Sequence, residues 1–458
     1  MRPAFGLPLS IILAILQSPV QAATWQVPSE CPTIQAGIDS ASAGDTVLVA
    51  CGTYDEHNIV MKAGVWVRGE TGDPGCVVVL PRPYAGPVFQ CDSLDCAAAI
   101  EALTIAGGVA DWGGGLFCRH TSLRLADVVF RSNVAGHQGG AIYCCYGSDL
   151  SIVDCEFLLN RVPGGMGPIG GAVYVSSGST VTLSACAFSE NYAYLDGGAL
   201  LCRDCSVNAT ECIFAGNATE DVGGAVCCEG VSSSAFTCCA FSGNSSWGGG
   251  AVWCWGCPLT VAGCVFSDNR AHWGGGGGLE GRYCHSLTLI DCVFLRNVST
   301  GSGGGGAIDA RGSTLLLDGC TFWGNSASQG GGLRLIESAD AALSNTIVAS
   351  CSQGEGIHCA SNSSAALVCS DLYGNAGGDW VGPIADQHGV DGNFSACPLF
   401  CDPENADFHL QECSPCAPGN HPQGYDCGLI GAWDVACGCG MPSAVESTTW
   451  SSLKARYR

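Results

Sequence analysis

Residues 212–252 read CIFAGNATEDVGGAVCCEGVSSSAFTCCAFSGNSSWGGGAV, and this stretch contains one pattern twice. A phenylalanine is followed three residues later by an asparagine, as in Phe214 with Asn217 and Phe241 with Asn244. A few residues further on, each copy has the run Gly-Gly-Ala-Val. Self-similarity at a short, regular spacing indicates a repeating structural unit.

The same pattern runs through most of the chain, and its successive phenylalanines lie 25 to 31 residues apart. The phenylalanines of the repeat are Phe130, Phe157, Phe188, Phe214, Phe241, Phe266, Phe294 and Phe322. The matching asparagines are Asn133, Asn160, Asn191, Asn217, Asn244, Asn269, Asn297 and Asn325.

Short runs within each repeat alternate between apolar and polar residues, as in the stretch TVTLS at 180–184. Alternation with a period of two is typical of strands with one buried face. No repeat contains a ten-residue amphipathic stretch, which disfavours helical arrays, and propeller blades need about 40 residues each. We therefore predict an all-β solenoid, a parallel β-helix in which each repeat forms one coil of three short strands.

Coils of such a solenoid stack about 4.8 Å apart, so equivalent residues form columns along its axis. We expect the phenylalanine column to fill the core. The asparagine column would occupy a turn, where neighbouring side-chain amides can bond to one another. The glycine pairs would allow adjacent backbones to approach closely at a corner.

Cysteine is abundant and has more than one interpretation. Two residues before each of seven consecutive phenylalanines, on the same face of the strand, lie Cys155, Cys186, Cys212, Cys239, Cys264, Cys292 and Cys320. They are either buried thiols acting as small apolar side chains or disulfides between adjacent coils. The pairs Cys202-x-x-Cys205 and Cys254-x-x-Cys257 are local disulfides, plain core residues, or redox or metal pairs.

Composition and charge limit the partners. The chain has 458 residues, 67 of them glycine and 33 cysteine, and its formal net charge is −24. So acidic a protein is disfavoured as a ligand of nucleic acid, whose phosphates require cationic side chains. An anionic polysaccharide would need Ca²⁺ to bridge the two negative surfaces.

The chain divides into four parts. Residues 1–22 have the short apolar segment and small-residue end of a secretory signal peptide, which predicts a secreted or cell-surface protein. Residues 23–396 are assigned to the β-helix, with a short capping helix at 32–43. Residues 397–440 are a Cys-rich closing segment in which disulfides are expected, and 441–458 are a polar tail, either frayed or a sorting signal.

Two motifs at the ends carry a family resemblance. The stretch PTIQAGI at 32–38, followed by GDTV at 44–47, resembles the N-terminal capping signature of bacterial right-handed β-helix proteins of the pectin-lyase-like superfamily. The segment 398–432 is similar to their closing segment, and the repeats resemble those of polymorphic outer-membrane adhesins. The resemblance covers about residues 24–440 and implies a right-handed parallel β-helix with a short N-terminal capping helix and a Cys-rich C-terminal cap.

Many members of that superfamily cleave acidic polysaccharides, with Asp clusters that hold Ca²⁺ and an Arg or Lys as the base. In this sequence the arginines fall at differing points of the repeat, and we expect them to build no column. Asp196, Glu220 and Asp221 lie in loops of neighbouring coils and either gather in space or are merely solvated. No catalytic residue, resident metal site or cofactor is predicted, and Ca²⁺ is kept only as an alternative.

A group of aromatic residues occurs in the loops before the glycine runs. Each tryptophan of the group directly precedes a Gly-Gly run. Because equivalent loops stack on one edge of the rod, this edge would present flat rings suited to sugar recognition, or rings that act as lids over the glycine corners. The candidate ligand-binding residues are Trp112, Trp247, Trp273, Tyr192, Tyr194 and Asp196.

The uniform repeat and the missing catalytic set favour a non-catalytic adhesion or binding rod. Its expected partner is an extracellular glycan or a surface protein, with no nucleic acid and no membrane span after signal removal. The alternatives are a polysaccharide lyase or glycoside hydrolase, and a structural surface-layer component. The sequence indicates no particular oligomeric state.

Overall fold

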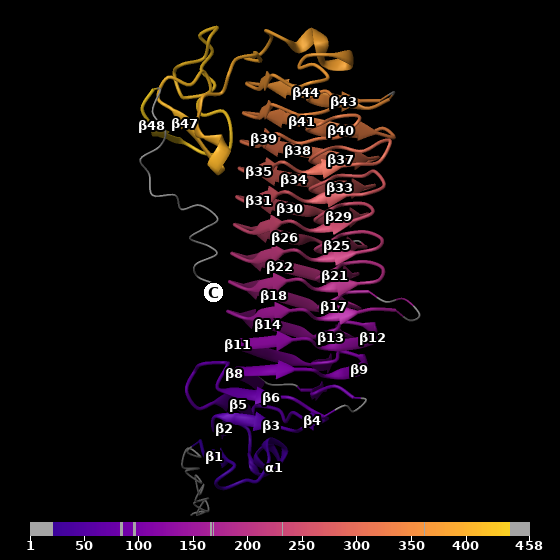
Figure 1. Ribbon diagram of the computed structural model, residues 1–458, viewed down its shortest axis with the longest axis vertical. Coiled ribbons are helices and arrows are strands. Elements are labelled where there is room, and N and C mark those ends of the chain that lie inside the picture. The colour runs from indigo at the N-terminus through magenta and orange to yellow at the C-terminus, as the bar shows by residue number, and fades with distance from the viewer. Residues whose placement is uncertain are drawn as a thin grey trace, which may run out of the picture.

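The computed structural model describes residues 22–82, 86–94, 98–164, 167, 169–230, 232–360 and 362–439. The chain forms the predicted right-handed parallel β-helix, a rod whose coils stack along one axis (Figure 1). Each strand pairs in parallel with its equivalent in the next coil, as in Phe214 with Phe241. The predicted signal peptide, apart from residue 22, and the predicted tail lie outside the described residues.

The coils have two faces that belong to one continuous sheet. The first face consists of β1 (Thr24–Val27), β2 (Thr46–Val49), β5 (Trp66–Gly69), β8 (Ala98–Ala106), β11 (Ser122–Arg131), β14 (Asp149–Val153), β18 (Thr180–Ser184), β22 (Ser206–Thr210), β26 (Ser234–Thr237), β30 (Leu259–Ala262), β34 (Leu287–Ile290), β38 (Thr314–Asp318), β41 (Asp340–Ser344) and β44 (Ser364–Val368). The second face continues from β8 and β11 and consists of β3 (Gly52–Tyr54), β6 (Val77–Val79), β15 (Glu156–Leu158), β19 (Ala187–Ser189), β23 (Ile213–Ala215), β27 (Ala240–Ser242), β31 (Val265–Ser267), β35 (Val293–Leu295), β39 (Thr321–Trp323), β42 (Ile347–Ala349) and β45 (Asp371–Tyr373).

Two further sheets complete the coils. The larger, here called sheet B, consists of β4 (Ile59–Val60), β7 (Phe89–Asp92), β10 (Leu116–Arg119), β13 (Ile142–Cys145), β17 (Val173–Ser176), β21 (Leu200–Arg203), β25 (Val226–Glu229), β29 (Val252–Trp255), β33 (Leu279–Arg282), β37 (Ile308–Arg311), β40 (Leu333–Ile336) and β43 (Ile357–Cys359). The smaller, sheet C, consists of β9 (Val109–Trp112), β12 (Val134–Gln138), β16 (Arg161–Val162), β20 (Tyr192–Ala193), β24 (Ala218–Thr219), β28 (Ser245–Ser246), β32 (Arg270–Ala271) and β36 (Val298–Ser299).

The repeat phenylalanines form one continuous stack inside the rod. Neighbouring rings from Phe130 to Phe322 are nearly parallel, with centroids 4.4 to 5.0 Å apart. All of them are fully buried. Stacked aromatic pairs contribute about 0.5–1.5 kcal/mol each beyond the burial of their area, so this column stabilises coil-on-coil packing.

The repeat asparagines form a second buried column, made of hydrogen bonds. Asn217 Nδ2 donates to the carbonyl of Phe188 one coil earlier at 2.9 Å and to Asn244 Oδ1 one coil later at 3.0 Å. The backbone N–H of Asn217 donates to the same Oδ1, also at 3.0 Å. Each side chain therefore satisfies backbone groups at a corner where the strand ladder is interrupted.

The glycine pairs belong to the corner before sheet B. A Cβ atom at Gly224 would lie 2.1 Å from the carbonyl oxygen of Gly250 in the next coil. Only glycine fits there, because the carbonyl oxygen could move away from a Cβ atom only if the two coils moved apart.

The seven cysteines that precede the phenylalanines are buried free thiols. Several of them point at carbonyl oxygens of the preceding coil, as Cys186 does toward Ile152 and Cys239 toward Ala209, each at 3.5 Å. This arrangement agrees with the first of the two interpretations, small side chains that fill the core beside the phenylalanine stack.

We expect these seven thiols to remain unmodified until the rod unfolds. The measurement is alkylation of the non-reduced protein with and without denaturant, followed by peptide mass spectrometry. All seven should be labelled only after denaturation, because thiols buried in an apolar core are inert. Cys51 and Cys76 form a disulfide and serve as the internal control, because both should stay unlabelled with and without denaturant. Disulfides among the seven would contradict the arrangement.

A short helix closes the N-terminal end of the rod. Helix α1 (Ile34–Ser40) begins at Thr33, whose side chain accepts a hydrogen bond from the backbone N–H of Ala36. Ile34 and Ile38 are buried against the first coil. The predicted helix at 32–43 is thus present. No helix among the described residues is both long and apolar enough to span a membrane.

The Cys-rich segment lies along the side of the last coils (Figure 1). It contains η2 (Pro403–Asn405) and a small sheet of β46 (Phe400–Asp402), β47 (Asp407–Gln411) and β48 (Val435–Cys437), and η1 (Gly382–Gln387) precedes it in the chain. Its apolar residues pack on the outer side of the second face, with the rings of Trp323 and Phe400 5.4 Å apart. The segment therefore covers a surface that would otherwise be an exposed apolar patch.

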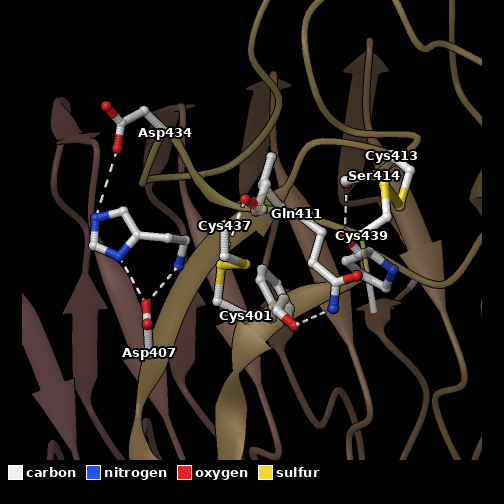
Figure 2. The surroundings of a disulfide bond; sticks show 12 residues. Cys401, Asp407, Gln411, Cys413, Ser414, Asp434, Cys437 and Cys439 are labelled. Atoms are coloured by element: carbon white, nitrogen blue, oxygen red, sulfur yellow. Dashed lines mark hydrogen bonds and ion pairs between the residues drawn. A yellow bond between two sulfur atoms is a disulfide. The ribbon is translucent and has the colours of Figure 1, made fainter. Parts of the chain in front are cut away.

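Disulfides hold this segment together, as expected for its composition. Cys401 pairs with Cys437 and Cys413 with Cys439 around the small sheet (Figure 2). The pair Cys369–Cys427 ties the segment to the rod. His409 Nδ1 lies 2.7 Å from Asp407, which adds a polar contact within the sheet.

Candidate functional site

A cluster of charged residues occupies the outer face of sheet B. Strands β33, β37 and β40 are adjacent, and their register places Glu280 beside Asp309 and Asp309 beside Arg334. Arg282 and Arg311 are register partners two residues further along. We call these five residues the carboxylate–arginine cluster.

Each acid of the cluster contacts two arginines. Glu280 Oε1 lies 2.6 Å from Arg282 Nε and 3.6 Å from Arg311 Nε. Asp309 accepts from Arg311 Nη2 at 3.0 Å and from Arg334 Nη1 at 3.3 Å. Three guanidinium groups therefore surround two carboxyl groups, and the cluster carries a net positive charge within a strongly acidic protein when both acids are ionised.

Glycine-rich loops cover the two carboxyl groups, which are 0% exposed. A Cβ atom at Gly275, whose φ is +90°, would lie 2.0 Å from Glu280 Oε2, so this position requires glycine. Glu280 Oε2 and Arg334 Nε have no hydrogen-bond partner among the described residues. Burial, followed by the neighbouring charge of Asp309, raises the pKa of Glu280 to about 7. Burial raises the pKa of Asp309 as well.

The same loops present two tryptophans to solvent. Trp247 directly precedes Gly248, which also lies over Glu280, and Trp273 lies two residues before Gly275. The two rings stack with centroids 5.8 Å apart and are 47% and 75% exposed. The backbone N–H of Trp273 donates to the carbonyl of Trp247 at 3.0 Å, which fixes the distance between the two loops along the rod axis.

Trp112 does not join this pair. Strands β12 to β24 of sheet C separate β9, which carries Trp112, from β28, which precedes Trp247. Trp112 instead lies against His137, with ring centroids 5.6 Å apart, and lines a cavity of about 510 Å³ together with Phe117 and Pro163. The six residues predicted as one ligand-binding group therefore lie at three places along the rod.

The remaining members of the predicted group lie together on the coil of β20, two coils before that of Trp247. Tyr192 is half-buried and Tyr194 is 49% exposed. Burial, with the nearby charges of Asp221 and Glu229, raises the pKa of Asp196 to about 7. Among the described residues, Asp196, Glu220 and Asp221 do not form a group close enough to share a metal ion.

The expectation that the arginines build no column was wrong at sheet B. Arg282 and Arg311 are direct register partners, and both contact Glu280. The signal was present in the sequence, because the segments 279–282 and 308–311 each have an acid at the second position and an arginine at the fourth. The recurring feature is the pair of an acid and an arginine, and the position of the arginine alone does not reveal it.

Comparison with known families agrees with this architecture. The model of the right handed beta helix region family matches residues 95–266 and 259–383, more than half of the chain. The chain therefore belongs to this family. No curated protein sequence matches it significantly.

Three solved structures are similar to this chain at low identity. Tailspike protein 3 of bacteriophage CBA120 is 11% identical, with a TM-score of 0.42 over 76% of this chain and 59% of the tailspike chain. The chain thus spans about three fifths of the tailspike's length. Pectate lyase Pel9A is 10% identical, with a TM-score of 0.36 over 91% of this chain and 98% of the lyase. The A-module of the Azotobacter vinelandii mannuronan C-5 epimerase AlgE4 is 15% identical, with a TM-score of 0.30 over 73% and 94%.

We expect the protein to lose stability as the pH rises from about 4 to about 7. Burial raises the pKa values of Asp196, Glu280 and Asp371 to about 7 in the folded state, above the usual values of about 4 in an unfolded chain. The folded state then binds more protons within this window, so its stability is greatest below it. Calorimetric melting temperatures at pH 4.5 and pH 7.5 test this, and Glu280→Gln should reduce the difference. A melting temperature that rises over this interval would contradict the assignment.

Proposed function

We propose that this protein is secreted or surface-displayed and binds an extracellular polysaccharide without cleaving it, at the loops that carry Trp247 and Trp273. The stacked, exposed pair of rings supports this proposal most directly. Aromatic rings offer a flat apolar face with a polar edge, which matches the two faces of a sugar ring. Their glycine-rich loops are held by backbone hydrogen bonds between coils, so the rings are positioned before a ligand arrives.

Charge narrows the class of polysaccharide. With a formal net charge of −24, the protein repels anionic chains over most of its surface. A neutral glycan meets no such barrier. An acidic glycan would bind only when Ca²⁺ bridges its carboxylates to those of the protein, so Ca²⁺ dependence distinguishes the two classes.

Alanine substitution of either tryptophan is expected to weaken glycan binding about tenfold, which corresponds to about 1.4 kcal/mol. The ligand is first found on an array of neutral and uronate-containing glycans, with and without Ca²⁺. Titration calorimetry then compares the wild type with Trp247→Ala and Trp273→Ala.

Trp66→Ala is the matched control, since Trp66 is also exposed, at 41%, but belongs to β5 near the other end of the rod. Equal affinities of the wild type and both loop variants for the array ligand would rule the site out. A protein that is silent on the array and assembles with itself would indicate the structural surface-layer alternative.

A glycan-cleaving enzyme is the second candidate, favoured by the carboxylate–arginine cluster. A carboxyl group with a pKa near 7, as for Glu280, carries a transferable proton at neutral pH, and it would act as a general acid once the loops over it move aside for a glycan. Screens for reducing sugars and for unsaturated products on the same glycans test this. Turnover that is lost in Glu280→Gln would replace the binding function with an enzymatic one.

A further inference from the structure

Three cysteines from two adjacent coils meet in the core behind sheet B. Cys254 lies in β29, Cys257 in the turn that follows it, and Cys284 in the equivalent turn after β33. Their sulfur atoms all lie within 4.8 Å of one another. The sulfur of Cys254 is 2.7 Å from that of Cys257 and 3.3 Å from that of Cys284. All three residues are buried.

Three sulfur atoms this close together in a buried position form an assembled set of soft ligands. Thiolate is the form in which cysteine binds metal ions. A single negative charge in an apolar core is unfavourable unless a cation accompanies it.

An earlier coil provides an internal comparison. Cys202 and Cys205 have the same spacing, and the register aligns Cys202 with Cys254 through Cys228. This pair forms a disulfide. Its next coil has no cysteine in the following turn, at 230–233, whereas the pair at Cys254 has Cys284. The third sulfur is therefore the feature that distinguishes the two sites.

We propose that Cys254, Cys257 and Cys284 bind one Cu(I) ion in a three-coordinate site. Soft thiolate ligands select Cu(I), and the three sulfurs supply all the ligands of a three-coordinate ion. Structural Zn²⁺ requires a fourth ligand, and the described His, Cys, Asp and Glu residues supply only these three to the group. Hard cations are disfavoured because all three side-chain ligands of the group are sulfur atoms.

Burial determines how the ion enters. Both coils must be in place to bring Cys284 beside the other two sulfurs, yet the completed stack leaves none of the three exposed. The ion therefore binds as the coils close, with release of thiol protons, and dissociates slowly from the folded rod.

The test is reduction and unfolding of the full chain, followed by anaerobic refolding with or without Cu(I). Weakly bound copper is removed with a Cu(I) chelator, copper is counted by mass spectrometry, and its ligands are identified by X-ray absorption. The wild type should retain one copper ion per chain with three sulfur ligands. Cys284→Ser should lose it and still fold, because Ser313 occupies the equivalent turn position of the next coil.

Cys264→Ala is the control, a buried thiol of the same coil outside the group, and it should retain the ion. Equal copper content in the wild type and Cys284→Ser would overturn the proposal. A disulfide between Cys254 and Cys257 in wild type refolded with Cu(I) would overturn it too. Should Cys284→Ser not regain the circular dichroism of the wild type, Cys257→Ser takes its place with the same two outcomes.

Discussion

Asn244→Ala is expected to lower the free energy of unfolding by about 3–9 kcal/mol, since three buried groups lose their partner at about 1–3 kcal/mol each. These groups are the backbone N–H and the side-chain amide of Asn217 and the carbonyl of Phe214. Urea unfolding followed by circular dichroism measures the loss.

Asn208→Ala is the matched control, because Asn208 is exposed on β22 and should change stability by no more than about 0.5 kcal/mol. Hydrogen exchange adds a local test, in which the amides of 214–217 should lose protection before those near Phe130. Equal destabilisation by the two substitutions would show that the asparagine column does not hold the corner.

Arg311→Ala is expected to destabilise the rod by about 3 kcal/mol at pH 8, because it leaves two buried carboxylates without one of their cations. Arg311 is the residue that contacts both Asp309 and Glu280. The loss should shrink below pH 5, where Glu280, whose pKa is raised to about 7, is protonated and needs no counter-charge. Thermal unfolding of wild type and variant at the two pH values measures this difference.

Arg131→Ala is the control for the arginine substitution, since Arg131 lies at the exposed end of β11. A loss of the same size at pH 5 and pH 8 would mean that Arg311 acts through packing of its aliphatic part and not through charge. In that case Glu280 would be neutral throughout, and its role as a general acid in the alternative enzymatic function would lose its basis.

Much of the rod could be predicted because like residues recur at one period. Phe214 and Asn217 have equivalents in every neighbouring coil, and such a periodicity allows only a stacked structure. The candidate site was predicted in part, since Trp247 and Trp273 do meet. Trp112 lies in the same sheet C but several coils away, and a shared repeat position says nothing of how many coils lie between two residues.

Sequence alone thus determined the architecture, the buried phenylalanine and asparagine columns, and the loops that carry the aromatic rings. Tertiary structure alone decided which unlike residues meet. The contact of Arg311 with Glu280, the packing of the Cys-rich segment on Trp323, and the approach of Cys284 to Cys254 all join different positions of different coils or segments. Contacts of this kind depend on side-chain direction and on loops of unequal length, which a repeat pattern does not record.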